Sequence, residues 1–499
     1  MLKITIKNNY QTYFTYTKYI LILLFFWLSI NTGSKYIDSG NLIENLTNNT
    51  VNFTRSILPY IALIYLLSTE KIFKKNISNI DYFFIFFGLY GLFQILGLLY
   101  QYNNLNEHYW VVCLYSALLF YKIIKNKNDE KLINFLFISN IMFISIIFLI
   151  FIFVTFKENI LSTHLLYNSR AFSLIYNTEQ LPRSSGLSRM ALILFVFLNS
   201  LYFSKICSSK QKTFLLIKIS LLISILFLLQ SRGPFLSFII IFISWIILFK
   251  IKKKIKYFFF TIIIPIIIFI SYPNLKNFLI NIQETSTKSF GSKSSTKSFE
   301  LKLRPDLIFS NEIKNDNLTT KITQISNNRV EAWNFLIQVF FRNELKDEMK
   351  KKIEYSGYDT NKFNKPKRKN ILTGYGPQAD RYFMYNSSRV NEAPQILGPF
   401  GYNASNGIIY SLICSGILGL ICYMVLNIII LFQILKVFLF KFKSKNLIDN
   451  PILVTSIFSI LFLQFRSLFE NSFSVFGVDL LILITSYLVV QNEYRKLKS

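Results

Sequence analysis

Residues 133–156 read INFLFISNIMFISIIFLIFIFVTF, a run without a single charged side chain. A helix needs about 20 residues, at about 1.5 Å each, to cross the hydrocarbon core of a bilayer, and this run is long enough. Because no water reaches that core, every backbone amide in it needs an internal hydrogen-bond partner, which only a helix or a closed barrel provides. A barrel strand would alternate apolar and polar residues, and this run does not. It therefore predicts a membrane-spanning α-helix.

Similar runs recur along the whole chain of 499 residues, which is 52% hydrophobic and only 16% charged. A soluble domain of this size would need more charge to cover its surface. The sequence therefore predicts an all-α polytopic membrane protein with about twelve transmembrane helices. The run at 407–437 is long for one span, so we expect it to tilt or to extend its first turns beyond the membrane. The predicted spans are 14–32, 56–69, 82–101, 109–124, 133–156, 188–205, 213–229, 234–249, 257–272, 407–437, 451–468 and 474–490.

Lysine follows every second predicted span. Clusters of lysine come after 56–69, 109–124, 188–205, 234–249 and 407–437, and both chain ends are basic as well. Because short loops rich in lysine and arginine stay in the cytoplasm, this alternation predicts that both termini are cytoplasmic. The net charge of +29 is usually a sign of nucleic-acid binding, but here the topology accounts for it. We therefore expect no nucleic-acid partner.

One long segment, 274–405, interrupts this pattern and carries charges of both signs. It divides the chain into nine spans within 1–273, a large loop, and three spans within 406–499; the alternation places the loop outside the cytoplasm. Long loops are usually functional or disordered. Residues 328–338, NRVEAWNFLIQ, predict a helix, and residues 372–381, LTGYGPQADR, predict a Gly/Pro turn followed by a polar segment. The charged stretch 344–369 predicts a solvated helix and turn.

Arginine is concentrated on the predicted outer side, whereas most basic residues on the inner side are lysine. Arg183 and Arg189 flank a predicted turn, LPRSSGLSRM, and Arg232, Arg329 and Arg466 lie at other predicted outer positions. A guanidinium group offers a planar fork of donors that fits phosphate oxygens. A cation at a membrane edge is costly and often functional. One such arginine is explained by an ion pair or by snorkelling, but all five together predict an anion site.

Four carboxylates on the same predicted side are candidate proton acceptors: Glu331, Asp380, Glu392 and Glu470. Each alone is more often a paired or solvated carboxylate, and Glu470 is also a candidate ion-pair partner of Arg466. The chain has two histidines, too few for a multi-histidine metal site, and no phosphate loop of the G-x-x-x-x-G-K-S/T type. We therefore expect no metal and no cofactor, and a substrate that arrives already activated.

Residues 405–419, SNGIIYSLICSGILG, follow the large loop directly. Asn406, Gly416 and Gly419 in this stretch match the spacing of a motif of the O-antigen polymerase and O-antigen ligase superfamily, bacterial membrane proteins of polysaccharide assembly. The segment SRGPF at 231–235 resembles an arginine-containing outer turn of that family. Arg329 and the later GYG at 374–376 are similar to a segment of its long loop. The resemblance covers roughly residues 130–490, and the position of the long loop between the ninth and tenth spans also matches.

This resemblance implies a GT-C-like fold with a large, partly helical periplasmic loop, in the bacterial inner membrane. It implies a glycan donor linked through diphosphate to undecaprenol, and a chain-length regulator is a further candidate partner. On this basis the expected catalytic residues are Arg232, Arg329, Asn406 and Glu470. The expected substrate-binding residues are Arg183, Arg189, Gly374, Gly376, Asp380, Arg381 and Arg466.

Three functions remain open at this point. In the ligases a histidine stands where this chain has Ser405, and a neutral serine cannot act as a base near pH 7 without its own activator. This difference favours a polymerase that joins lipid-linked O-antigen repeat units on the periplasmic face. The first alternative is a ligase that transfers finished polymer to lipid A–core. The second is a polysaccharide flippase, although a transporter would be expected to carry ionisable or helix-breaking residues at mid-membrane.

Overall fold

The computed structural model describes a chain that is mainly helical, without a β-strand in the described part. The residues that it describes are 2–30, 57–68, 81–99, 108–161, 184–229, 231–248, 255–272, 329–342, 344–355, 358–366, 369–385, 404–443 and 449–497. Five helices are long and apolar enough to cross a membrane, at Glu130–Phe153, Gly186–Phe203, Ser209–Leu229, Ile255–Tyr272 and Gly407–Lys443. The prediction of an α-helical, multi-pass membrane protein is confirmed at this level.

Each predicted span overlaps a helix. Before the large loop these helices are α1 (Leu2–Ser29), a helix at Ile57–Ser68, α3 (Tyr82–Leu98), α4 (His108–Lys127), α5 (Glu130–Leu161), α6 (Ser184–Phe203), α7 (Ser209–Leu229), α8 (Arg232–Leu248), and α9 (Ile255–Phe258) with η3 (Phe259–Ile263) inside the helix that ends at Tyr272. After the loop they are α16 (Gly407–Lys443), α17 (Pro451–Arg466) and α18 (Val478–Lys496).

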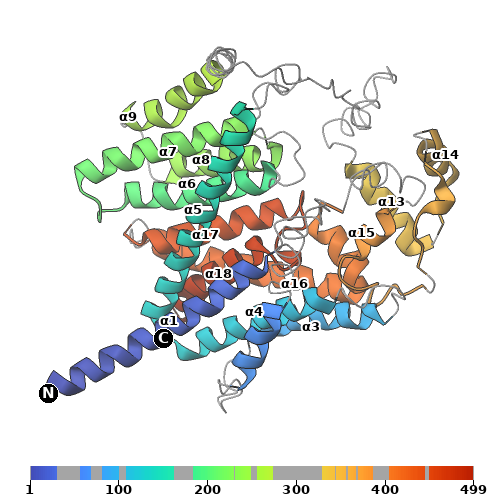
Figure 1. The fold of residues 1–499 in the computed structure, drawn as a ribbon, viewed down its shortest axis with the longest axis horizontal. Helices are drawn as coiled ribbons and strands as arrows, with labels where there is room; N and C mark the ends of the chain where they lie inside the picture. Colours follow the sequence, from blue (N-terminus) through green and yellow to red (C-terminus); the bar gives the residue numbers. More distant parts are fainter. Residues whose placement is uncertain are drawn as a thin grey trace, which may run out of the picture.

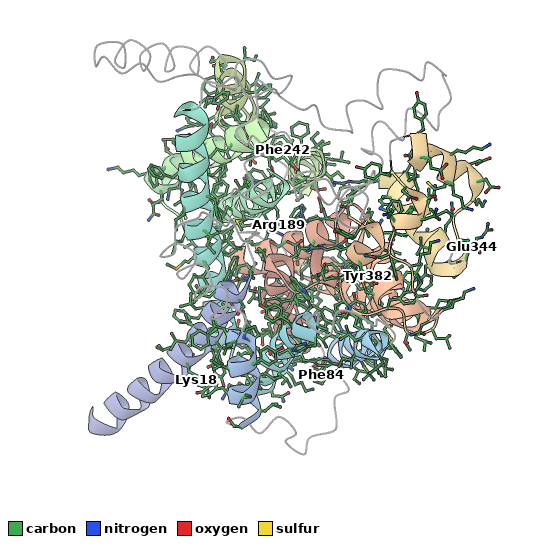
Figure 2. The ribbon with its side chains drawn as sticks, turned by 45° about the vertical axis from the view of Figure 1, so that its right-hand side comes forward. Lys18, Phe84, Arg189, Phe242, Glu344 and Tyr382 are labelled. Atoms are coloured by element: carbon green, nitrogen blue, oxygen red, sulfur yellow. The ribbon has the colours of Figure 1, made fainter. Side chains whose placement is uncertain are left out.

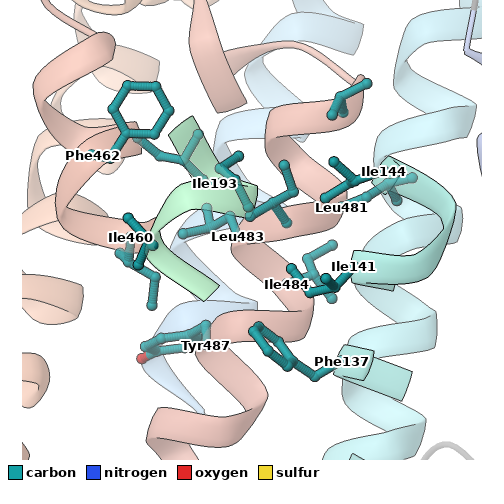
Figure 3. Packing of buried hydrophobic residues seen from close by; sticks show 14 of the residues in the cluster. Phe137, Ile141, Ile144, Ile193, Ile460, Phe462, Leu481, Leu483, Ile484 and Tyr487 are labelled. Atoms are coloured by element: carbon teal, nitrogen blue, oxygen red, sulfur yellow. The ribbon is translucent and has the colours of Figure 1, made fainter. Parts of the chain in front are cut away.

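The last three helices form the centre of the bundle. In Figure 1, α3 and α4 lie on one side of them and α6, α7 and α8 on the other. α16 packs most extensively against α3, and α17 packs against α6 and α18. Buried aliphatic side chains fill the contact between α5, α6, α17 and α18, among them Ile141, Ile193, Ile460 and Leu481 (Figure 3). Since lipid is as apolar as these side chains, close packing rather than water exclusion holds such helices together.

One end of the bundle gathers the lysine-rich connections. Lys441 pairs with Glu493 at 2.6 Å, and Lys496 pairs with Glu130 at 2.8 Å. These contacts join the ends of α16 and α18 to the start of α5. A further ion pair, between Lys205 and Asp449 at 3.1 Å, joins the end of α6 to the start of α17. Among the described residues, lysines that follow predicted spans therefore take part in contacts between helix ends.

The described part of the large loop packs at the opposite end, where Figure 1 shows α13 (Arg329–Arg342), α14 (Asp347–Tyr355) and α15 (Ala379–Met384). The helix predicted over 328–338 is confirmed by α13. The solvated helix predicted within 344–369 is confirmed by α14, whose charged side chains are mostly exposed. The loop has an apolar core of its own, which includes Phe335, Phe340 and Tyr375 and continues into Ile413 of α16. The first turns of α16 therefore pack with the loop.

α16 is interrupted at Gly416, where φ is +68° and ψ is −170°. The chain just before and within the predicted Gly/Pro turn lies against this break. The backbone carbonyl oxygens of residues 371 and 372 accept hydrogen bonds from the backbone N–H groups of Ile417 (3.0 Å) and Leu418 (3.1 Å). The N–H groups of residues 375 and 376 donate to the oxygens of Ile413 (3.0 Å) and Cys414 (2.9 Å). The turn therefore satisfies backbone groups that the break leaves open, as a membrane-embedded helix requires.

Glycine makes this contact possible. Gly374 and Gly376 both have positive φ, +71° and +89°, which favours glycine over residues with a side chain. A Cβ atom at Gly416 would lie 2.3 Å from the Leu372 oxygen, and one at Gly97 would lie 2.4 Å from the Gly376 nitrogen. The turn is therefore enclosed between the backbones of α3 and α16.

The predicted turn LPRSSGLSRM is wrong over its last seven residues, because α6 begins at Ser184. Leu187, Met190 and Ala191 are buried and share one side of that helix. Their spacing follows the helical period, so burial of this side stabilises a helix where the local Ser/Gly composition alone indicated a turn. Arg189, labelled in Figure 2, therefore lies within the first turns of α6.

Candidate anion-binding site

The turn after α17, residues 467–471, is where α16 is anchored. Asn406 donates from Nδ2 to the Leu468 oxygen (2.9 Å) and from its backbone N–H to Asn471 Oδ1 (3.1 Å). Its own Oδ1 accepts from the backbone N–H groups two and three residues later, at 2.8 and 3.0 Å, and so caps the helix. The Gly407 N–H donates to the Ser467 oxygen at 2.7 Å. Asn406 thus fixes the start of α16 against this turn.

Arg329 joins the large loop to the same turn. Its Nη1 donates to the Phe469 oxygen at 2.5 Å, and its Nη2 lies 3.4 Å from Glu470 Oε1. Further along α13, Trp333 Nε1 donates to the Ala404 oxygen at 2.7 Å, immediately before the start of α16. α13, α16 and the turn after α17 therefore meet around Arg329 and Asn406, two residues that the sequence predicts to act together.

Behind this turn lies a buried charge cluster. Asp479, at the start of α18, accepts from Arg189 Nη1 at 2.8 Å and from Arg466 Nε at 3.0 Å. The side chains are 3% exposed for Asp479, 8% for Arg466 and 15% for Arg189. The sequence interpretation missed Asp479, although it is the one acidic residue within the predicted span 474–490. A lone carboxylate in an apolar run is a signal of a paired charge, and it would have identified this residue.

The cluster carries more positive than negative charge. Arg189, Arg329 and Arg466 contribute three positive charges, and Glu470 and Asp479 two negative ones, so these five residues keep one positive charge. Within the described part of the chain, Arg189 Nε is buried and donates no hydrogen bond. Guanidinium groups with excess positive charge are suited to bind an anion, and phosphate oxygens match their geometry.

The other predicted carboxylates have different surroundings. Asp380 in α15 is fully buried, and its Oδ2 accepts from the Ala404 N–H at 2.8 Å. Burial raises the pKa of Asp380, although that hydrogen bond opposes the shift. Asp380 therefore positions the segment before α16. Glu331 in α13 forms an ion pair with Lys352 of α14, so it stabilises the loop helices against each other.

The structure brings together Arg189, Arg329, Asn406, Arg466 and Glu470 of the predicted site residues. It assigns the ion pairs differently from the sequence interpretation: Glu470 pairs with Arg329, and the carboxylate that holds Arg466 is Asp479. Because the chain turns at 467–471, Glu470 faces α13 whereas Arg466 still faces the helical bundle.

The remaining predicted site residues lie around this cluster or outside the described residues. Gly374 and Gly376 form the backbone contact between α3 and α16, and Arg381 is exposed on α15. Arg232 is the first residue of α8, and its side chain lies outside what the structure describes. Arg183 and Glu392 lie outside the described residues as well.

Comparison with known proteins agrees with the motifs. No curated protein matches the chain. The family model described as O-antigen ligase matches residues 217–342, about a quarter of the chain, and this stretch contains both Arg232 and Arg329. The match includes the motif at 231–235 and Arg329, whereas the motifs at 374–376 and 405–419 lie outside it. It confirms that the chain is similar to the superfamily of O-antigen polymerases and ligases.

Proposed function

We propose that this chain is a glycosyltransferase that polymerises undecaprenyl-diphosphate-linked O-antigen or related polysaccharide repeat units. The observation that carries this proposal is the excess positive charge of Arg189, Arg329 and Arg466 at one end of a membrane bundle, opposite the lysine-rich end. A lipid-linked diphosphate needs both a membrane setting and cationic groups that bind phosphate. The family match over residues 217–342 supports the same class of substrate.

The proposal includes a topology. Twelve spans in a GT-C-like arrangement, with both termini in the cytoplasm, place the arginine cluster and the large loop on the periplasmic side of the bacterial inner membrane. The separation of the two ends supports this orientation, because lysine-rich short loops stay in the cytoplasm. On the periplasmic side there is no nucleotide supply, and the diphosphate of the donor supplies the leaving group.

The reaction requires the chain to stabilise the leaving group and to provide a base for the acceptor hydroxyl. A hydroxyl oxygen of the acceptor sugar attacks the anomeric carbon of the donor, the bond from that carbon to the diphosphate oxygen breaks, and the hydroxyl proton passes to a base. Arg329 and the pair Arg189 and Arg466 would stabilise the negative charge that develops on the departing diphosphate. Glu470 is the accessible carboxylate of the cluster, 22% exposed, and is the candidate base.

A ligase is the second candidate, and the description of the matching family model favours it. The products separate the two functions. Loss of a polymerase abolishes the ladder of repeat lengths but leaves single repeat units attached to lipid A–core. Loss of a ligase removes polymer from the core while lipid-linked polymer accumulates.

Arg329→Ala is expected to lower polymer formation on the order of 100-fold, since it removes a charged donor from the leaving group. The measurement is the repeat-length ladder produced when the variant is expressed in a strain that lacks the wild-type protein. Arg232→Ala, the second family-like arginine, should give the same result. Arg342→Ala is the control, because Arg342 is exposed at the other end of the same helix. A normal ladder from both Arg329→Ala and Arg232→Ala would show that the phosphate site is assigned wrongly.

A further inference from the structure

The ion pair between Arg329 and Glu470 is the accessible part of the charge cluster. The side chain of Arg329 is 31% exposed and that of Glu470 is 22% exposed, whereas Asp479 is only 3% exposed. An anion that approaches from outside the bundle therefore reaches Arg329 and Glu470 before it reaches the buried pairs. The position beside Arg329 is occupied by the carboxylate of Glu470.

This carboxylate is weakly held compared with its neighbours. Glu470 Oε1 lies 3.4 Å from Arg329 Nη2, whereas the contacts of Asp479 measure 2.8 and 3.0 Å. Ion pairs that are partly exposed contribute little to stability, so their separation costs little. The Arg329 guanidinium is also anchored independently, by the 2.5 Å hydrogen bond from Nη1 to the Phe469 oxygen. It would therefore stay in place if Glu470 moved away.

We propose that Glu470 is a built-in counter-ion of Arg329 that an incoming lipid diphosphate displaces. A carboxylate and a phosphate offer a guanidinium group the same pair of oxygen acceptors, so each can replace the other. Glu470 thus competes with the substrate for Arg329, and it keeps the arginine neutralised while the site is empty. This inference rests on the proposed function, because it takes the diphosphate of the donor as the displacing anion.

The test is a binding measurement on the purified full-length protein in detergent, with farnesyl diphosphate as a short isoprenoid diphosphate probe. Glu470→Gln keeps the shape of the side chain and removes its charge, so it is expected to lower the Kd roughly tenfold. Arg329→Ala is expected to raise the Kd at least about tenfold. Glu331→Gln is the matched control, since it removes a paired carboxylate from α13 that contacts Lys352 instead. Its Kd should equal that of the wild type.

The double variant Arg329→Ala/Glu470→Gln tests whether the gain in affinity for the diphosphate depends on Arg329. In the Arg329→Ala background, Glu470→Gln should bring no further increase in affinity, because the two effects are coupled. A gain that persists in that background would overturn the proposal. Glu470→Asp, which keeps the charge but draws it away from Arg329, is a second variant and should also tighten binding. Each variant is first checked for a single symmetrical peak in size-exclusion chromatography.

The possible outcomes distinguish a failure of the counter-ion proposal from a failure of the proposed function. If Arg329→Ala weakens binding but Glu470→Gln leaves the Kd unchanged or raises it, the counter-ion role is wrong and the diphosphate site stands. If neither substitution changes the Kd, the anion site itself is misplaced, and the proposed function loses its support together with the inference.

Discussion

Asp479→Ala is expected to destabilise the folded protein by about 3–5 kcal/mol, because it leaves two buried guanidinium groups without their shared carboxylate. Asp479 accepts from Arg189 at 2.8 Å and from Arg466 at 3.0 Å, and it joins the start of α6, the end of α17 and the start of α18. We expect the variant to have a strongly reduced midpoint of thermal unfolding in detergent and little polymerising activity. The midpoint is measured by size-exclusion chromatography after heating.

The control is Asp449→Ala at the lysine-rich end. Asp449 also forms an ion pair between helices, with Lys205 at 3.1 Å, but the two side chains are 41% and 83% exposed. Such a pair contributes at most about 1 kcal/mol, so the midpoint should hardly change. Equal midpoints for the two variants would mean that the buried cluster does not hold the bundle together.

Gly416→Ala is expected to prevent the large loop from docking on the membrane helices. A side chain at this position combines a φ of +68° with a Cβ only 2.3 Å from the Leu372 oxygen. The backbone conformation alone costs about 1–3 kcal/mol. The clash adds to this cost, because the atom that the Cβ meets belongs to the backbone and cannot move aside as the end of a flexible side chain could. We therefore expect a loss of at least about 3 kcal/mol and rapid proteolysis of the loop in the purified protein.

Gly88→Ala in α3 controls for the general effect of a methyl group on a membrane helix. A Cβ at Gly88 meets no atom within 4 Å, and alanine favours helix more than glycine does. Protease resistance should therefore match the wild type or exceed it. If Gly416→Ala were equally resistant, the turn at 372–376 would not depend on the break in α16.

The helices were predictable because the span pattern is local. Twenty apolar residues in succession have one solution in a bilayer, and every predicted run overlaps a helix. The break at Gly416 was not predictable, because the hydrogen bonds that stabilise it come from residues about 45 positions earlier, such as the one from the Ile417 N–H to the Ile371 oxygen. The unusual length of the run at 407–437 was the one local sign that α16 is not a plain span.

The arginines of the candidate site were predicted from the sequence, but the carboxylate that pairs with each of them was not. An arginine at a membrane edge is costly and often functional. This rule singled out Arg189, Arg329 and Arg466 from the sequence. Which carboxylate faces which arginine depends on packing, since Arg189 and Asp479 are 290 residues apart. Asp479 itself escaped notice because it lies inside an apolar run rather than among the polar outer segments. Composition therefore indicated an anion site, and only the fold determined its internal pairing.

The claim on which all of this depends is that the arginine end and the large loop face away from the cytoplasm. Tyr355→Cys places a thiol on α14 at a position that is 81% exposed, and the native Cys207, partly exposed near the Lys205–Asp449 pair, reports on the opposite end. In intact cells treated with a membrane-impermeant maleimide, the account predicts labelling at residue 355 and labelling of Cys207 only after the inner membrane is opened. Labelling of Cys207 in intact cells, with protection of residue 355 until lysis, would contradict it.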